Sequence, residues 1–207
     1  MSDSGEEKQV EIFNYLSVII SIILGLGLGH LLTGCARLIA TRQTLTISWL
    51  YVSWIVLLFP VYVTYWWAFW DYRKHVHWSF VSFFFLLIGP TGLYLITALL
   101  LPDLSNKICF NATAHYLNIR YWFFVLWIVL QIWGIMLSPW LKEGIKLTSF
   151  LNRYKYAQYL LLLALVSGFF NVVLSRQNLL VDTGVLSIFW LVLVYLLSAH
   201  RRILKIG

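Results

Sequence analysis

Residues Ile12–Ile39 read IFNYLSVIISIILGLGLGHLLTGCARLI, an apolar run in which Arg37 is the only charged side chain. A helix needs about 20 apolar residues to cross the hydrocarbon core of a bilayer, and this run is longer than that. Small residues recur at every fourth position along it, namely Ser17, Ser21, Gly25, Gly29 and Thr33. The stretch therefore predicts a membrane-spanning helix with one face of small side chains.

The rest of the 207-residue chain has the same apolar character. Its residues are 61% hydrophobic and only 11% charged, with a mean hydropathy of +0.81, whereas soluble domains carry about 25% charged residues. Apolar runs of membrane-spanning or nearly membrane-spanning length occupy Ile12–Ile39, Ile47–Trp70, Trp78–Leu101, Tyr121–Leu141, Tyr154–Leu174 and Leu179–Leu197. We therefore expect an all-α, polytopic integral membrane protein, with six transmembrane helices in one compact bundle.

The charges between these runs predict the orientation of the chain. We divide it into an acidic tail (1–11), a transmembrane domain (12–200) and a basic tail (201–207). Of the fifteen Lys and Arg residues, ten fall on the side of the two tails, so the positive-inside rule places both termini in the cytoplasm of a multi-pass protein. Basic residues there favour contact with anionic lipid at the cytoplasmic face. A nucleic-acid groove would need basic residues clustered on one soluble surface, and none is expected.

The small residues of the first span suggest close packing of helices. Residues four apart lie nearly one above another on a helix, and small side chains let two helix backbones approach closely in a membrane. The face could form a seam within one subunit, a seam between subunits, or the wall of a pore or ligand site. These three interpretations remain open at this point.

His30 lies beside this face and shares its own side of the helix with Gly34 and Arg37, at spacings of four and seven residues. An ionisable residue inside a membrane is costly and is by default a functional hypothesis. Histidine changes charge near physiological pH, which suits proton relay or pH gating. The alternative is a neutral histidine that forms a hydrogen bond to a neighbouring helix.

Two prolines interrupt the second and third spans near their centres, at Pro60 and Pro90. Each removes one helical hydrogen bond and frees a carbonyl group, which in lipid must find a partner or face a cavity. Gln131 places a polar group at the centre of the fourth span. These residues suggest a site at mid-membrane depth; alternatively, they belong to bent helices whose polar groups are satisfied.

The absent motifs also restrict function. The eight acidic residues fall in tails, loops or at span ends, so we expect no buried carboxylate for proton coupling. No metal, nucleotide or nucleophile motif appears, and we therefore expect no catalytic residues, no cofactor and no metal site. Cys35 and Cys109 fall on the same predicted side of the membrane, and whether they form a disulfide is left open.

Together these features favour a homo-oligomeric membrane channel or facilitator for an ion or small solute. The residues expected to line or shape its pathway or gate are His30, Gly25, Gly29, Arg37, Pro60, Pro90 and Gln131. The alternative is a non-catalytic membrane scaffold or sensor subunit that binds partner proteins.

Overall fold

A computed structural model describes residues 3–40, 45–46, 48–70, 78–102, 110–141, 150–173 and 179–204. Within these ranges the chain forms six helices and one pair of two-residue strands. The helices are α1 (Asp3–Ala40), α2 (Trp49–Trp70), α3 (Phe80–Leu100), α4 (Ala112–Leu141), α5 (Phe150–Val173) and α6 (Leu179–Leu204). Strand β1 (Leu45–Thr46) pairs in parallel with β2 (Phe110–Asn111).

Four of the six described helices are long and apolar enough to cross a membrane. These segments are Glu11–Ala40, Trp49–Phe69, Phe80–Leu100 and Ala112–Gly134. The apolar parts of α5 and α6 are shorter, at Tyr159–Val173 and Leu179–Tyr195. The prediction of an all-helical membrane protein is therefore confirmed, with four candidate spans by length and composition.

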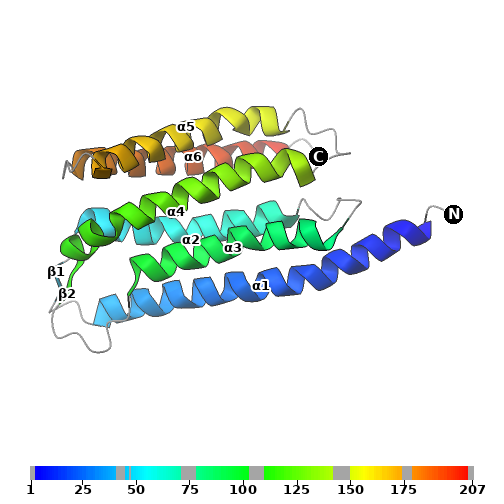
Figure 1. Ribbon diagram of the computed structural model, residues 1–207, viewed down its shortest axis with the longest axis horizontal. Helices are drawn as coiled ribbons and strands as arrows, with labels where there is room; N and C mark the ends of the chain where they lie inside the picture. Colours follow the sequence, from blue (N-terminus) through cyan, green and yellow to red (C-terminus); the bar gives the residue numbers. More distant parts are fainter. Residues whose placement is uncertain are drawn as a thin grey trace.

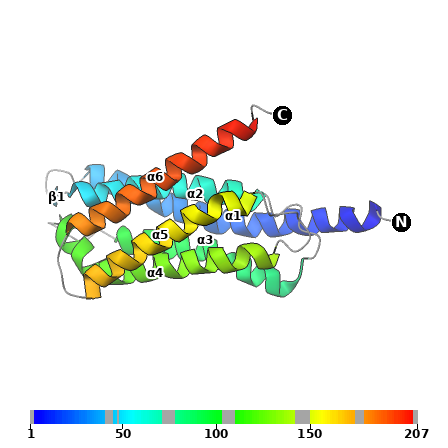
Figure 2. The same ribbon diagram turned by 90° about the horizontal axis from the view of Figure 1, so that it is seen from above.

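The helices lie side by side along the long axis of the molecule (Figures 1 and 2). The strand pair marks one end of the bundle, which we call the strand end, and the start of α1 and the last turn of α6 lie toward the other end (Figure 1). α3 packs between α1 and α4, and α5 packs on both α4 and α6. Because α1 packs mainly on α2 and α3, it forms an edge of the bundle, with one long face directed away from the other helices.

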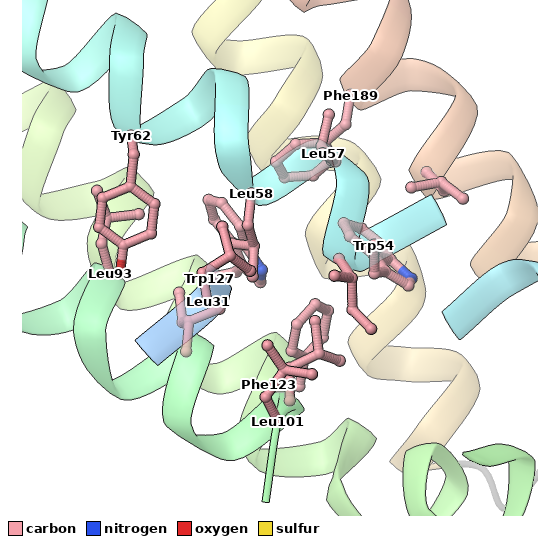
Figure 3. Close-up of a cluster of buried hydrophobic side chains, with 14 of the residues drawn as sticks. Leu31, Trp54, Leu57, Leu58, Tyr62, Leu93, Leu101, Phe123, Trp127 and Phe189 are labelled. Carbon is pink, nitrogen blue, oxygen red and sulfur yellow. The ribbon is translucent and has the colours of Figure 1, made fainter. Parts of the chain in front are cut away.

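The core contains aromatic rings that join α2, α4 and α6 (Figure 3). The ring of Trp54 lies 5.0 Å from Phe123 and 5.4 Å from Phe189, at interplanar angles of 74° and 72°. Trp127 lies 5.0 Å from Phe189 at 66°. Such edge-to-face pairs stabilise by about 0.5–1.5 kcal/mol beyond the area they bury, so this cluster fixes the relative positions of the three helices.

α4 starts earlier than the apolar run predicts. It begins at Ala112 rather than Tyr121, and the side-chain oxygen of Asn111 accepts a hydrogen bond from the backbone N–H of Ala114 at 3.0 Å. Such a bond satisfies one of the N–H groups left free at a helix start. The apolar run begins only after Arg120, whereas the helix extends upstream of this residue. Hydropathy scores an arginine as polar whether or not the fold gives it a partner. α1 likewise begins at Asp3, so its helix extends into the acidic N-terminal segment.

Candidate functional site in the strand-end half of the bundle

The C-terminus of α3 is held by side chains from three other helices. The last carbonyl groups of a helix lack partners within it, and here the three consecutive carbonyls of residues 99–101 each accept a side-chain hydrogen bond. The donors are His115 of α4 at 3.2 Å, Tyr51 of α2 at 2.6 Å and His30 of α1 at 3.0 Å. We call this arrangement the α3 cap. Because a carbonyl only accepts, Nε2 of each histidine carries the hydrogen.

His30 thus has a structural partner, the carbonyl oxygen of Leu101, and it also borders a groove on the outer face of α1. The groove has a volume of about 600 Å³. Four of the residues expected in a pathway line it, namely Gly25, Gly29, His30 and Arg37. The groove therefore combines an imidazole and a guanidinium with a glycine-rich floor.

The small-residue face of α1 does not pack against the rest of this subunit at its centre. Gly25 and Gly29 are exposed, and a Cβ built on either meets no atom within 4 Å in the part of the chain described here. Thr33 is exposed as well. The hydroxyls of Ser17 and Ser21 donate to carbonyls of α1 itself. Gly25 and Gly29 therefore do not form a packing seam within one subunit, because α1 turns this face away from α2 and α3.

Two other glycines make the close contacts of α1. A side chain at Gly27 would collide with the ring of Tyr62 in α2, and one at Gly34 would meet Leu101 at 2.8 Å. These residues interrupt the four-residue spacing, which is why the spacing alone did not identify them. The seam within the subunit therefore runs along a different face from the one the spacing indicates.

The remaining pathway candidates do not join the groove. Pro90 is buried within α3, and the carbonyl of Leu86, four residues earlier, accepts a hydrogen bond from the Tyr65 hydroxyl at 3.4 Å. A neighbouring helix thus supplies a partner for the group that the proline leaves free. Pro60 and Gln131 are half-buried within α2 and α4.

A second polar region, which the sequence analysis missed, surrounds Asp182 in the first turn of α6. Its side chain is fully buried. One carboxylate oxygen accepts from Nδ2 of Asn171 in α5 at 3.2 Å, and the other accepts from the Tyr116 hydroxyl of α4 at 3.2 Å. Nη1 of Arg120 lies 3.8 Å from the same second oxygen. The expectation of no buried carboxylate is therefore wrong: Asp182 lies near a helix end, as expected, but three side chains cover it.

The pairing was hidden because the two charges lie at the starts of different apolar runs. Arg120 directly precedes one run and Asp182 lies near the start of another, so each resembled an interfacial residue. One signal was present: Tyr116 and Arg120 are four residues apart and share a helix face, once the helix is extended upstream. That extension placed both residues on the buried side of α4.

No protein-family model, curated protein or solved structure matches the chain. Among the described residues, no group of three His, Cys, Asp or Glu side chains could hold a metal ion. Cys35 is half-buried in α1, whereas Cys109 lies outside the described residues, and so does their possible disulfide.

Proposed function

We propose that this protein is a non-catalytic membrane subunit that associates with a second copy of itself through the small-residue face of α1. The observation that carries the proposal is the open space at Gly25 and Gly29. Lipid tails provide little drive for helix association, so membrane helices associate where small residues permit close backbone contact. An exposed pair of glycines four residues apart on an edge helix offers such a contact to another helix.

This proposal includes the topology that the sequence predicts. α5 and α6 would complete a six-span bundle, since both helices pack beside α4 or α2. An even number of spans leaves both termini on one side, and the distribution of basic residues favours the cytoplasm. Anionic lipid would then be the partner of the basic residues on that side.

Association in bilayers tests the proposal. Fluorescently labelled protein is diluted into liposomes, and the dimer fraction is measured by energy transfer against protein density. Gly29→Leu should weaken association by about tenfold, or about 1.4 kcal/mol, because a large side chain keeps the helices apart. The matched control is Gly184→Leu in α6, since Gly184 is also exposed with nothing within 4 Å of a built Cβ among the described atoms.

Equal dimer fractions for both variants and the native chain would contradict the proposal. A monomeric native chain that co-purifies with another membrane protein in a fixed ratio would instead assign the α1 face to that protein.

The second candidate function is a homo-oligomeric channel or facilitator for an ion or small solute. It is favoured by the groove that places His30 and Arg37 beside the glycine face of α1. If α1 helices surrounded a central axis, these two side chains would lie near it. Flux of protons, ions or water through proteoliposomes should then exceed that of empty vesicles and change with His30→Ala. Absence of flux above empty vesicles would exclude this function.

A further inference from the structure

The buried region around Asp182 contains a charged hydrogen-bond donor that reaches no acceptor in the described part of the chain. Arg120 is 5% exposed and Trp54 is 0% exposed. Nη1 of Arg120 has no hydrogen-bond partner among the described residues, whereas Nε1 of Trp54 is directed at the Tyr116 hydroxyl. A buried donor without a partner costs about 1–3 kcal/mol, and a charged donor costs more. The Nη1 group of Arg120 therefore requires an acceptor that the described side chains do not supply.

The existing contacts leave unused capacity on the carboxylate. An ionised carboxylate can accept about four hydrogen bonds, and Asp182 receives two, both at 3.2 Å. Nη1 of Arg120, at 3.8 Å, is beyond the usual range of a direct hydrogen bond. A small molecule that both donates and accepts would satisfy the two groups together, and water is the smallest such molecule.

A groove between α2 and α6 lies next to this region. Its volume is about 590 Å³, and its walls carry the hydroxyls of Ser48, Ser53, Thr183 and Ser187. Thr183 directly follows Asp182, and Ser53 directly precedes Trp54. We call it the hydroxyl groove.

Two buried leucines on the wall of the hydroxyl groove each lie one helical turn from a residue of the buried region. Leu50 and Leu186 line the groove and are both buried. Trp54 lies one turn after Leu50 on the same face of α2, and Asp182 lies one turn before Leu186 on the same face of α6.

The hydroxyl oxygens of this groove are available as acceptors. Thr183 and Ser187 donate to carbonyls of the preceding turn, of Leu179 and Thr183 respectively, at 2.8 and 2.9 Å, which leaves lone pairs of the oxygens unused. Ser187 lies about 12 Å along α6 from its first residue at 1.5 Å per residue. The groove thus begins at the strand end, where α2 and α6 both start, and extends inward for that distance.

We propose that the hydroxyl groove is a water-filled vestibule and that its water hydrates the buried Arg120–Asp182 pair. Hydrocarbon cannot bond to the oxygen lone pairs that Thr183 and Ser187 leave free, whereas water can bond to them and also supply the missing acceptor for Arg120. The carboxylate is then in contact with solvent from the strand end only. This site is separate from the α1 face and does not depend on the association proposed above.

Cysteine accessibility tests the vestibule. In a background with Cys35→Ala and Cys109→Ala, Ser53→Cys and Ser187→Cys are each reacted in nanodiscs with a charged methanethiosulfonate reagent, which requires a hydrated thiolate. The control is Leu95→Cys, because Leu95 is 47% exposed on α3. It lies about 7.5 Å from the last residue of α3, which is between the depths of Ser53 and Ser187 at 1.5 Å per residue. Both groove cysteines should react several-fold faster than the control.

Oxidative footprinting tests the hydration of the pair in the unaltered chain. Hydroxyl radicals generated from bound ¹⁸O-labelled water oxidise the side chain beside that water. Tyr116, which is 1% exposed, should incorporate ¹⁸O several-fold faster than Tyr62, which is 3% exposed. The Tyr62 hydroxyl bonds to Thr97 between α2 and α3, away from the hydroxyl groove. Groove cysteines that react no faster than Leu95→Cys would overturn the proposal, and so would equal labelling of the two tyrosines.

Discussion

Replacing Asp182 by alanine removes a carboxylate that joins α4, α5 and α6. The change deprives Tyr116 and Asn171 of their bonds to this carboxylate and leaves the buried guanidinium of Arg120 without its counter-charge. Removing one partner of a buried ion pair costs about 3–5 kcal/mol. The lost hydrogen bonds overlap with that loss rather than adding to it, so we expect a decrease in the free energy of unfolding of about 3–5 kcal/mol.

The decrease is measured by titrating the purified protein from mild detergent into sodium dodecyl sulfate and following helix content by circular dichroism. Thr183→Ala is the control, because Thr183 is exposed and bonds only to its own helix among the contacts described. It should change the free energy by less than about 0.5 kcal/mol. The double variant Arg120→Met/Asp182→Leu should recover most of the loss, because apolar pairs of similar volume often replace buried ion pairs at no cost. A cost below about 1 kcal/mol for Asp182→Ala would refute the role assigned to this carboxylate.

Three further substitutions test other contacts by the same measurement. Ser79→Ala removes the side chain that accepts from the backbone N–H of Ser82 at the start of α3, and should cost about 1 kcal/mol. Tyr62→Phe removes the 2.8 Å hydrogen bond to Thr97; since Thr97 also bonds to its own helix, we expect about 0.5–1 kcal/mol. Gly27→Val forces a side chain against the Tyr62 ring, and should cost about 1–3 kcal/mol.

Each of these predictions has a control. Ser79→Thr retains a capping hydroxyl and should stay near the native stability. Tyr51→Phe removes the 2.6 Å bond to the Leu100 carbonyl from the α3 cap. It should cost at least as much as Tyr62→Phe, because Thr97 keeps its bond to the Leu93 carbonyl when Tyr62 is changed. Gly184→Val adds the same group at an open position, so a loss equal to that of Gly27→Val would contradict the packing argument.

The class of the protein was predictable from hydropathy because membrane insertion is decided segment by segment. The run at Ile12–Ile39 and the next two runs correspond closely to α1, α2 and α3. The start of α4 was not predictable in the same way. A hydropathy window assigns Arg120 the free-energy cost of an unpaired charge in lipid. The actual cost depends on Asp182, which lies more than 60 residues away in the chain but beside Arg120 in the fold.

The candidate site shows the same limit. The sequence identified His30 as unusual from its depth in the span, but its partner, the Leu101 carbonyl, lies 71 residues further along the chain. The four-residue spacing likewise identified a face of small residues, yet spacing gives no direction within the bundle. Only the packing of α1 at the edge shows that Gly25 points outward while Gly27 points toward Tyr62.

The α3 cap has a mechanical consequence. Three helices are tied to consecutive carbonyls of a single turn, through His30, Tyr51 and His115. If α1, α2 or α4 tilts while these bonds are kept, the helix must rotate about the last turn of α3. Displacements then grow with distance from this turn, so a small change in tilt at the end of α3 produces its largest movement at the opposite end of the bundle, where α1 begins and α6 ends.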